Sequence, residues 1–370
     1  MEKDNFNIDL LNKSLIIFFI DALKVAIKNP SQAFVFFRTL IWLVKASIKR
    51  KKFKRQGIHI PPIIIFSITN KCNLQCNGCY SLAFYGSSDK EMSDEKVRNI
   101  IKEAKEVGIS FFVIAGGEPL IRKEILNITK DFPKMIFLLF TNGLLIDDYV
   151  IEKLKQQKNV VPLISLEGYK DETDERRGAG VYENLQEIIK KLHKQNVFFG
   201  ASLTLTRPTF GTLTSIPYIQ TLFNAGNRFF LFIEYTSIKE GTENLVLTLE
   251  QRNKLMDLIK SFRSKFPALF IGVPGDEIAV GGCLAAGRGF VHINAEGNVE
   301  PCPFAPFSDA NVKESSLKDA LQSKFLKTIR EHPELLNPTE GGCSLWKKRE
   351  LVISLINKNE PFVKDISNKQ

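Results

Sequence analysis

The amino-acid sequence predicts an α/β fold: a partial (β/α)6 TIM-like barrel, with an N-terminal helical extension and a small C-terminal cysteine-containing α+β appendage. Three observations favour this fold. Six apolar strands alternate with helical segments between residues 60 and 265, which is typical of a parallel sheet covered by helices. An apolar and basic segment precedes the alternation. Glycines, prolines and three cysteines gather after it, in residues 271–345.

The domain organisation follows from these changes of pattern. The 370 residues, 44% hydrophobic and 25% charged, are enough for a sizeable core and for more than one unit. We find no signal peptide in MEKDNFNIDL and expect a cytoplasmic location, where cysteines more often bind metals or react than form disulfides. The expected parts are the extension (1–58), the barrel (59–268), the appendage (269–350) and a C-terminal tail (351–370).

The N-terminal extension is apolar and carries most of the net charge. Residues 8–48 are expected to be helical, with a break at residues 29–31. Neither apolar run reaches the roughly 18–20 uncharged residues of a membrane span. Residues 1–55 hold twelve Lys/Arg and four Asp/Glu, which gives +8 of the total +10. The main body is nearly balanced, so no nucleic-acid partner is expected.

Two interpretations of this extension stay open. Its basic end, KRKKFKR (residues 49–55), follows an apolar helix with Trp42 and several phenylalanines. This pattern favours peripheral contact of residues 8–55 with a membrane surface that contains anionic lipids. The alternative is a helical hairpin that packs on the body of the protein or on a second copy.

The alternating segments place polar residues at one edge of the sheet. Ligands bind at the carboxyl ends of the strands in such sheets. The expected strands are 63–69, 111–117, 135–143, 160–168, 197–206 and 228–238, and the expected helices are 93–107, 122–130, 147–157, 181–195, 212–225 and 249–265. Three cysteines follow the first strand, GGEP (residues 116–119) ends the second, and the turn TNG (residues 141–143) ends the third.

The three cysteines after the first strand indicate a metal centre. Cys72, Cys76 and Cys79 form a C-x3-C-x2-C motif. A structural zinc site needs four ligands, and no other cysteine or histidine lies nearby in the sequence. Three thiolates would leave one iron of a four-iron, four-sulfur cluster open.

CNLQCNGCY and GGEP, in this order along a strand–helix alternation, resemble the radical SAM (S-adenosylmethionine) enzymes over residues 62–345. The resemblance implies that Cys72, Cys76 and Cys79 hold a [4Fe-4S] cluster whose open iron chelates the methionine part of SAM. An electron from the cluster would then generate a 5′-deoxyadenosyl radical that abstracts hydrogen from a substrate. It also implies an electron donor such as flavodoxin or ferredoxin.

The same resemblance assigns cofactor contacts around the cluster. Gly116 and Gly117 would let the backbone approach a ligand closely, and Glu118 would accept hydrogen bonds from the methionine ammonium. Tyr80 resembles the aromatic residue near the adenine, with ordinary packing as the alternative.

Two further contacts come from the fourth strand and the turn that follows it. Ser165 and Arg177 resemble the contacts to the ribose or the carboxylate of SAM, and Arg176 competes with Arg177 for this role. The alternatives are a strand-end cap for Ser165 and a surface salt bridge for Arg177. Asn142, in the TNG turn, is expected to serve turn geometry.

The remaining cysteines, Cys283, Cys302 and Cys343, form a second set. HINAEGNVEPCPF predicts a hairpin that turns at residues 294–298, and a helix is expected at 315–331. The set resembles the SPASM/Twitch extension of radical SAM enzymes, closer to the shorter Twitch form with one auxiliary [4Fe-4S] cluster. With three cysteines, the fourth ligand is another residue, for which His292 is a candidate, or one iron is open. A zinc staple or a lost cluster is the alternative.

The substrate does not follow from the sequence. Glu234 is a candidate catalytic proton acceptor or substrate ligand because it ends the sixth strand, where we expect it to face the mouth of the sheet; a buried salt bridge is the alternative. Asp276 is a weaker candidate. The N-terminal extension favours a membrane- or lipid-linked substrate over a peptide- or protein-modifying maturase. A non-catalytic metal-binding scaffold is the alternative of a different class, and the intact GGEP argues against it.

Overall fold

The computed structural model describes residues 7–27, 29–86, 90–337 and 343–357. A nine-stranded sheet forms the centre of this part of the chain, in the order β7-β6-β5-β4-β3-β2-β1-β8-β9. Every neighbouring pair from β7 to β8 is parallel, and β8 pairs with β9 antiparallel. The strands are β1 (Ile63–Ser67), β2 (Phe111–Ala115), β3 (Ile136–Thr141), β4 (Val160–Leu166), β5 (Gly200–Leu205), β6 (Phe229–Glu234), β7 (Leu269–Val273), β8 (Phe290–Ile293) and β9 (Val299–Glu300).

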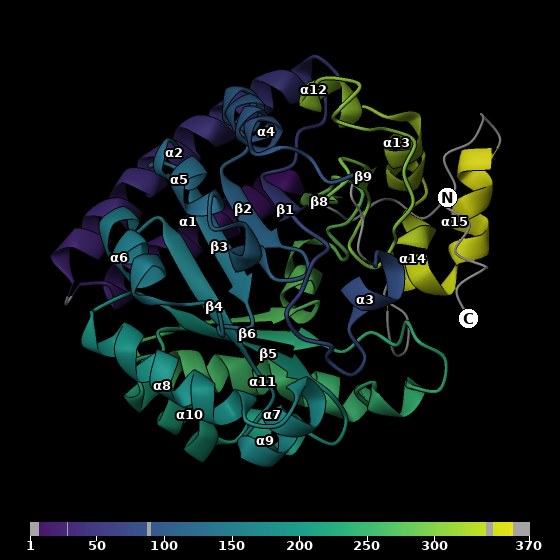
Figure 1. Cartoon of the computed structure of the whole chain (residues 1–370). Helices are drawn as coiled ribbons and strands as arrows, with labels where there is room; N and C mark the ends of the chain where they lie inside the picture. Colours follow the sequence, from purple (N-terminus) through teal and green to yellow (C-terminus); the bar gives the residue numbers. More distant parts are fainter. Residues whose placement is uncertain (1–6, 28, 87–89, 338–342, 358–370) are drawn as a thin grey trace.

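Helices cover the outer side of this sheet (Figure 1). The α-helices are α1 (Ile8–Val25), α2 (Pro30–Arg55), α3 (Tyr80–Phe84), α4 (Asp94–Val107), α5 (Ile125–Lys130), α6 (Asp148–Gln157), α7 (Lys170–Arg177), α8 (Val181–Lys194), α9 (Phe210–Leu213), α10 (Ile216–Asn224), α11 (Leu249–Lys265), α12 (Leu317–Ala320), α13 (Lys324–Glu331), α14 (Ser344–Lys347) and α15 (Arg349–Asn357). The 3-10 helices are η1 (Pro119–Arg122), η2 (Glu243–Leu245), η3 (Gly275–Val280) and η4 (Pro333–Leu335).

The strands bury both faces, which explains their continuous apolar composition. Side chains alternate across a strand, so Phe112 and Phe137 face the helices while Phe111 and Leu138 face the interior of the barrel. The predicted partial barrel with N-terminal helices and a C-terminal appendage is confirmed. It positions the carboxyl ends of β1 to β6 at a common mouth.

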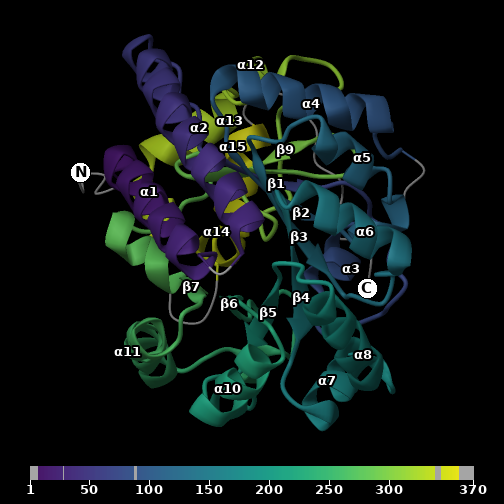
Figure 2. The same ribbon diagram turned by 90° about the vertical axis from the view of Figure 1, so that its left-hand side faces the viewer.

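The N-terminal extension is a helical hairpin that fills the opposite end of the barrel. Asn29 caps α2 by accepting a hydrogen bond from the Gln32 N–H at 3.2 Å. Phe19, Phe36 and Leu43 pack in one buried cluster with the first residues of β2, β3, β6 and β7. Figure 2 shows α1 and α2 side by side over this end of the sheet. The hairpin therefore packs on the body, as one of the two interpretations expected.

One residue of the basic tail is structural. Arg50 is buried, and it donates hydrogen bonds to the Gly108 carbonyl oxygen and to Asn12 Oδ1. Burial lowers the pKa of Arg50 to about 10. The exposed basic tail is therefore smaller by one charge than the sequence indicates.

Four expected elements or boundaries differ from the structure. Residue 269, where we expected the appendage to begin, opens β7, which pairs with β6 and extends the barrel. The charged segment KDETDERR, expected as a turn, is helix α7. The helix expected at 212–225 is divided into α9 and α10, because Ser215 caps a new helix by accepting from the Tyr218 N–H. The helix expected at 315–331 is likewise two helices, α12 and α13.

The appendage continues the barrel sheet. The predicted hairpin is present as β8 and β9, and the Asn294 side chain closes it by accepting from the Glu296 and Asn298 N–H groups, each at 3.0 Å. β8 pairs parallel with β1, the strand that leads to Cys72, and β9, which leads to Cys302, pairs with the other edge of β8.

Candidate active site

The cysteine loop (residues 68–79) is held against the end of β2 by two glycines. A Cβ atom at Gly116 would lie 2.2 Å from the Thr69 carbonyl oxygen, and one at Gly117 would lie 2.2 Å from the Lys71 carbonyl oxygen. In the same place the Gly117 and Glu118 N–H groups donate to these two oxygens, each at 2.8 Å. The glycines are therefore needed for the close packing of the cysteine loop on the end of β2, and their close approach to a ligand stays a prediction.

Glu118 joins the end of β2 to the turn after β3. Its carboxylate is fully buried and accepts hydrogen bonds from the Leu120 N–H (2.9 Å), the Thr141 hydroxyl (2.8 Å) and the Asn142 N–H (2.7 Å). Burial raises the pKa of Glu118, and these bonds act against that rise. Because a carboxylate offers about four acceptor positions, the three bonds leave room for one more donor, such as an ammonium.

The turn after β3 reaches the first cysteine. Gly143 has a φ of +84°, and its N–H donates to Thr141 Oγ1 at 2.9 Å, which is the turn chemistry that the sequence predicted. The Asn142 side chain also donates to Asn73 Oδ1 at 2.8 Å and lies 3.9 Å from Cys72 Sγ. GGEP, the TNG turn and the cysteine loop therefore converge as expected.

Two arginines of α7 lie beside Cys76. Arg177 donates from Nε to Glu167 Oε1 at 3.1 Å, and Arg176 donates from Nη1 to Glu167 Oε2 at 2.7 Å. The Glu167 side chain is 2% exposed and the Arg177 side chain 10% exposed, so this ion pair is buried and is not the surface salt bridge weighed as the alternative. The Asn77 N–H donates to the Arg176 carbonyl oxygen at 2.9 Å, which fixes α7 to the cysteine loop.

The arginines favour the charged form of a nearby thiol. Burial raises the pKa of Cys76, and the positive charges of Arg177 and Arg176 lower it again. Burial likewise raises the pKa of Cys72, with smaller contributions in the same direction from Glu118 and Cys79. A positively charged centre would relieve this repulsion, since metal ligation requires thiolates. Sequence reasoning missed Glu167, although it lies two residues after Ser165 and directly follows β4.

Ser165 and Tyr80, two of the expected cofactor contacts, lie in different parts of the site. Ser165 lies near the end of β4, on the same face as Val161 and Leu163, and thus toward the barrel interior. The Tyr80 ring contacts Phe304 of the appendage, with 5.1 Å between centroids. Burial first, and then Cys79 and Cys302, raise the pKa of Tyr80, which places it between the two cysteine sets.

A second tyrosine next to the cysteine loop was missed. Gly78 has a φ of +69°, and a Cβ atom there would lie 2.7 Å from the Tyr235 hydroxyl. Tyr235 directly follows β6, and its ring also contacts the Arg176 guanidinium. Its position directly after the end of β6 was the feature of the sequence that could have indicated a place near the cysteine loop.

The second cysteine set is also brought together. Cys302 and Cys343 share a hydrogen bond, which raises the pKa of Cys302 and lowers that of Cys343. Burial raises the pKa of Cys283, and the charges of Glu277 and Cys343 act in the same direction. Three cysteines that are spread over about 60 residues of the sequence thus meet in one region, in which Cys302 is buried and the other two are partly buried.

His292, the candidate fourth ligand, is occupied elsewhere. This fully buried ring contacts Ser67 Oγ through Nε2 at 2.8 Å and Glu300 Oε2 through Nδ1 at 2.6 Å. Tyr85 donates to the same Glu300 oxygen at 2.7 Å, and Asn294 donates to Oε1 at 2.7 Å. Because both ring nitrogens are used, the expectation that His292 ligates a metal is corrected: it ties β1 to β8 and β9.

Glu234 does not face the mouth. It has the side-chain direction of Phe230 and Phe232, toward the helices, and its Oε2 pairs with Arg252 Nε of α11 at 2.6 Å. This is the buried salt bridge that was the alternative to a catalytic role. Asp276 is likewise structural, because its Oδ2 accepts from the Gly272 N–H and pairs with Arg263, each at 2.9 Å.

Both sets fit a multi-iron centre better than a single ion. In the described part of the chain, no three His, Cys, Asp or Glu side chains lie close enough to hold one metal ion. In a cubane cluster each cysteine binds a different iron, so the ligands are spread more widely than around one ion. The first three cysteines share one loop, the second three come from three segments, and within each set the cysteines lie within electrostatic reach of one another, which suits such clusters.

Comparison with known families agrees with this geometry. Residues 66–212 match the radical SAM superfamily, and residues 283–344 match an iron-sulfur cluster-binding domain, SPASM. This chain belongs to the radical SAM superfamily. It is an enzyme of that superfamily with a C-terminal SPASM domain, and its cofactors are SAM, the SAM-binding [4Fe-4S] cluster and an auxiliary iron-sulfur cluster.

Several proteins are similar to this radical SAM enzyme. The AdoMet-dependent heme synthase of Methanosarcina barkeri is 22% identical over 318 residues, which cover 79% of this chain and 90% of that protein. The mycofactocin maturase MftC of Mycolicibacterium smegmatis is 28% identical, over 69% and 67% of the two chains. Streptococcus suis SuiB, solved with its precursor peptide SuiA, superimposes with a TM-score of 0.62 at 18% identity, over 80% of this chain and 72% of SuiB. The last likeness is one of fold.

Proposed function

We propose that Cys72, Cys76 and Cys79 hold the SAM-binding cluster of this radical SAM enzyme. The convergence of GGEP, the turn after β3 and the cysteine loop carries this proposal. When bound, the cluster would supply one electron to the sulfonium of SAM, which breaks its bond to the 5′ carbon and gives methionine and a 5′-deoxyadenosyl radical. Glu118 offers its remaining acceptor position to the ammonium of SAM, Gly116 and Gly117 set the loop, and Ser165, Arg177 and Tyr80 line the cofactor site.

Anaerobic reconstitution tests these assignments. We expect Cys72→Ala to keep the fold but to form no 5′-deoxyadenosine from SAM and dithionite, because its side chain lies in a loop. Deoxyadenosine formation by that variant would refute the ligand assignment.

We also propose that Cys283, Cys302 and Cys343 hold the auxiliary cluster, in an appendage that begins after β7, later than residue 269. The wild-type chain should then load about eight irons, two cubanes of four. About four irons per chain together with deoxyadenosine formation would instead indicate that the second set of cysteines holds no cluster and has a structural role, such as a zinc site. No iron at all would favour the non-catalytic scaffold.

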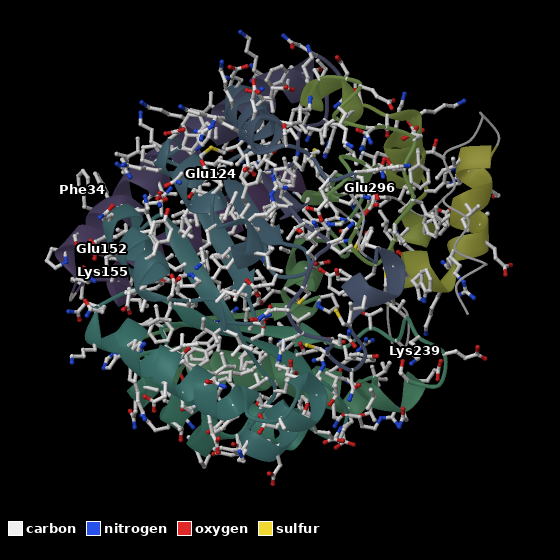
Figure 3. The ribbon with its side chains drawn as sticks, in the orientation of Figure 1. Phe34, Glu124, Glu152, Lys155, Lys239 and Glu296 are labelled. Carbon is white, nitrogen blue, oxygen red and sulfur yellow. The ribbon has the colours of Figure 1, made fainter. Side chains whose placement is uncertain are left out.

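The outer face of the hairpin supports a membrane-associated function. Nine of its large apolar side chains are exposed, and four of them are more than half exposed: Ile27 (74%), Ile48 (65%), Phe34 (62%) and Phe37 (53%). Phe34, Phe37, Ile41, Val44 and Ile48 recur every three or four residues, so they form one stripe along α2. Phe34 points away from the barrel (Figure 3). The described part of the chain has one helix, α2, that is long and apolar enough to cross a membrane by length and composition.

Basic side chains flank this stripe. Lys45, Lys52 and Arg55 are exposed, and at about 100° per residue they point within about 70° of the centre of the stripe. The other face of α2 is anchored to the body, for example by the bond from Gln32 Nε2 to the Lys158 carbonyl oxygen at 2.8 Å. We therefore propose that the hairpin lies in the interface of an anionic membrane, rather than crossing it.

Vesicle sedimentation tests this membrane contact. Replacing Lys45, Lys52 and Arg55 by alanine removes about 1 kcal/mol per charge, or roughly 100-fold in binding to phosphatidylglycerol-containing vesicles. The apolar variant Phe34→Ser/Phe37→Ser/Ile41→Ser should also lose binding. Its matched control, Ile216→Ser/Leu249→Ser, changes exposed apolar residues outside the hairpin and should bind normally. Vesicle binding that survives both hairpin variants would refute the proposal, and a dimer lost with the apolar variant would identify a second copy as the occupant.

The membrane face restricts the substrate that we propose. The hairpin packs on the first residues of the strands, whereas the cysteine loop leaves the other end of β1. Strands of five to seven residues, at roughly 3.3 Å per residue, separate the two by about 15–25 Å. A lipid-linked substrate would therefore present its reacting group on a polar chain or headgroup long enough to reach the mouth of the barrel.

A peptide substrate is the second candidate, because SuiB was solved with its precursor peptide and shares this fold. Deoxyadenosine formation should rise above the substrate-free rate when a lipid extract of the source cells is added. A rise with the aqueous peptide fraction alone would favour the peptide-modifying maturase.

A further inference from the structure

The auxiliary site has three cysteines and one iron position that they do not fill. The four histidines of the chain do not supply the missing ligand. Both nitrogens of His292 are used, His59 Nε2 contacts the Gly287 carbonyl oxygen at 2.6 Å, and His332 is an exposed residue that pairs with Glu334. His193 lies on α8, against Gly226, on the helical side of the barrel.

One acidic side chain is built into the second cysteine set. Glu277 lies in η3 and is 8% exposed. Its Oε2 accepts a hydrogen bond at 3.0 Å from the N–H of Leu284, the residue after Cys283. Its carbonyl oxygen accepts one at 3.0 Å from the N–H of Gly282, the residue before Cys283. Two bonds thus fasten Glu277 to the backbone on either side of the cysteine.

We propose that the Glu277 carboxylate is the fourth protein ligand of the auxiliary cluster, bound to the iron that Cys283, Cys302 and Cys343 leave open. The inference rests on the proposed role of these cysteines. A carboxylate oxygen is an ordinary ligand for iron. The hydrogen bond from the Leu284 N–H orients the carboxylate through Oε2, as outer partners of ligating carboxylates do. Ligation to iron requires one further acceptor position on the carboxylate.

The surroundings of Glu277 also favour a cation. The residue is 8% exposed, and its carboxylate is hydrogen-bonded to the backbone directly after Cys283. Metal ligation requires the neighbouring cysteines to be thiolates. A buried carboxylate beside three thiolates is costly unless the charges are compensated, and a cluster iron compensates them.

The test uses a chain in which only the auxiliary site can load. In a Cys72→Ala/Cys76→Ala/Cys79→Ala background, we expect about four irons per chain after anaerobic reconstitution. Adding Glu277→Gln should leave one iron fewer after mild oxidation and should give the electron paramagnetic resonance signal of a three-iron cluster. Glu277→Cys should restore the fourth iron, because a thiolate replaces the carboxylate.

Glu234→Gln is the matched control, since Glu234 is another buried carboxylate near Glu277 but is paired with Arg252. It should retain the fourth iron. A second measurement does not depend on iron retention: glutamate labelled with carbon-13 in its carboxyl group should show hyperfine coupling to the reduced cluster, and Glu277→Gln should abolish it. An unchanged cluster in Glu277→Gln would overturn the ligand assignment. A background chain that loads no iron would instead refute the auxiliary site itself.

Discussion

Replacing Gly117 by alanine should displace the cysteine loop. The new Cβ atom would lie 2.2 Å from the Lys71 carbonyl oxygen, 2.6 Å from its carbon and 2.8 Å from the Asn70 carbonyl oxygen, all of them backbone atoms. Overpacking of this kind costs about 1–3 kcal/mol. A backbone shift also stretches the bonds from the Gly117 and Glu118 N–H groups to the loop, each worth about 1 kcal/mol. We expect a loss of about 2–5 kcal/mol in the free energy of unfolding.

Two assays separate the local effect from a general one. Urea unfolding measures the stability loss. Iron per chain after anaerobic reconstitution should fall by about one cubane, because Cys72 follows Lys71 directly. Gly211→Ala is the matched control, since its Cβ would meet no atom within 4 Å, and it should change neither quantity. A Gly117→Ala chain that loads normally and loses less than about 0.5 kcal/mol would refute the reasoning.

Two further predictions concern buried ion pairs. Arg177→Met should lower the free energy of unfolding by about 3 kcal/mol, because it removes a partner of the buried Glu167. It should also raise the pKa of Cys76. In a chain with Cys76 as its sole cysteine, the pH profile of alkylation should therefore move to higher pH, and an unchanged profile would contradict this reasoning. For Glu234, burial raises the pKa above 4.5 despite Arg252, so the folded state binds more protons and stability falls as the pH rises from 4.5 toward the folded pKa. Glu234→Gln should flatten this fall in urea unfolding at pH 4.5 and 6, and an equally steep fall would contradict the cause given.

Much of the fold and part of the site were accessible from the sequence because they depend on local patterns. Continuous apolar strands between amphipathic helices predict a parallel sheet without knowledge of any contact. The order of the strands then places Cys72, Glu118 and Asn142 at one edge, and the structure confirms this convergence. The strand β7 was assigned to the wrong part because the glycines and prolines after it obscure the alternation.

The roles of individual charged side chains required the tertiary structure. Glu234, Glu167 and Glu277 all end or follow strands and are indistinguishable by sequence position. Their partners differ. Glu234 pairs with Arg252, 18 positions away, and Glu167 pairs with Arg177, 10 positions away. Glu277 accepts a hydrogen bond from the backbone beside Cys283. The energy of a buried charge depends on what lies within a few ångströms of it, and that is fixed only by packing.

The amino-acid sequence by itself determined the barrel, the spacing of Cys72, Cys76 and Cys79, and the basic apolar character of residues 8–55. Only the tertiary structure decided that one face of α1 and α2 fills the barrel while the other remains exposed, and that His292 is a structural link. Composition and periodicity report which residues avoid water. They do not report which surface covers them, because this depends on contacts between residues that are distant in the chain.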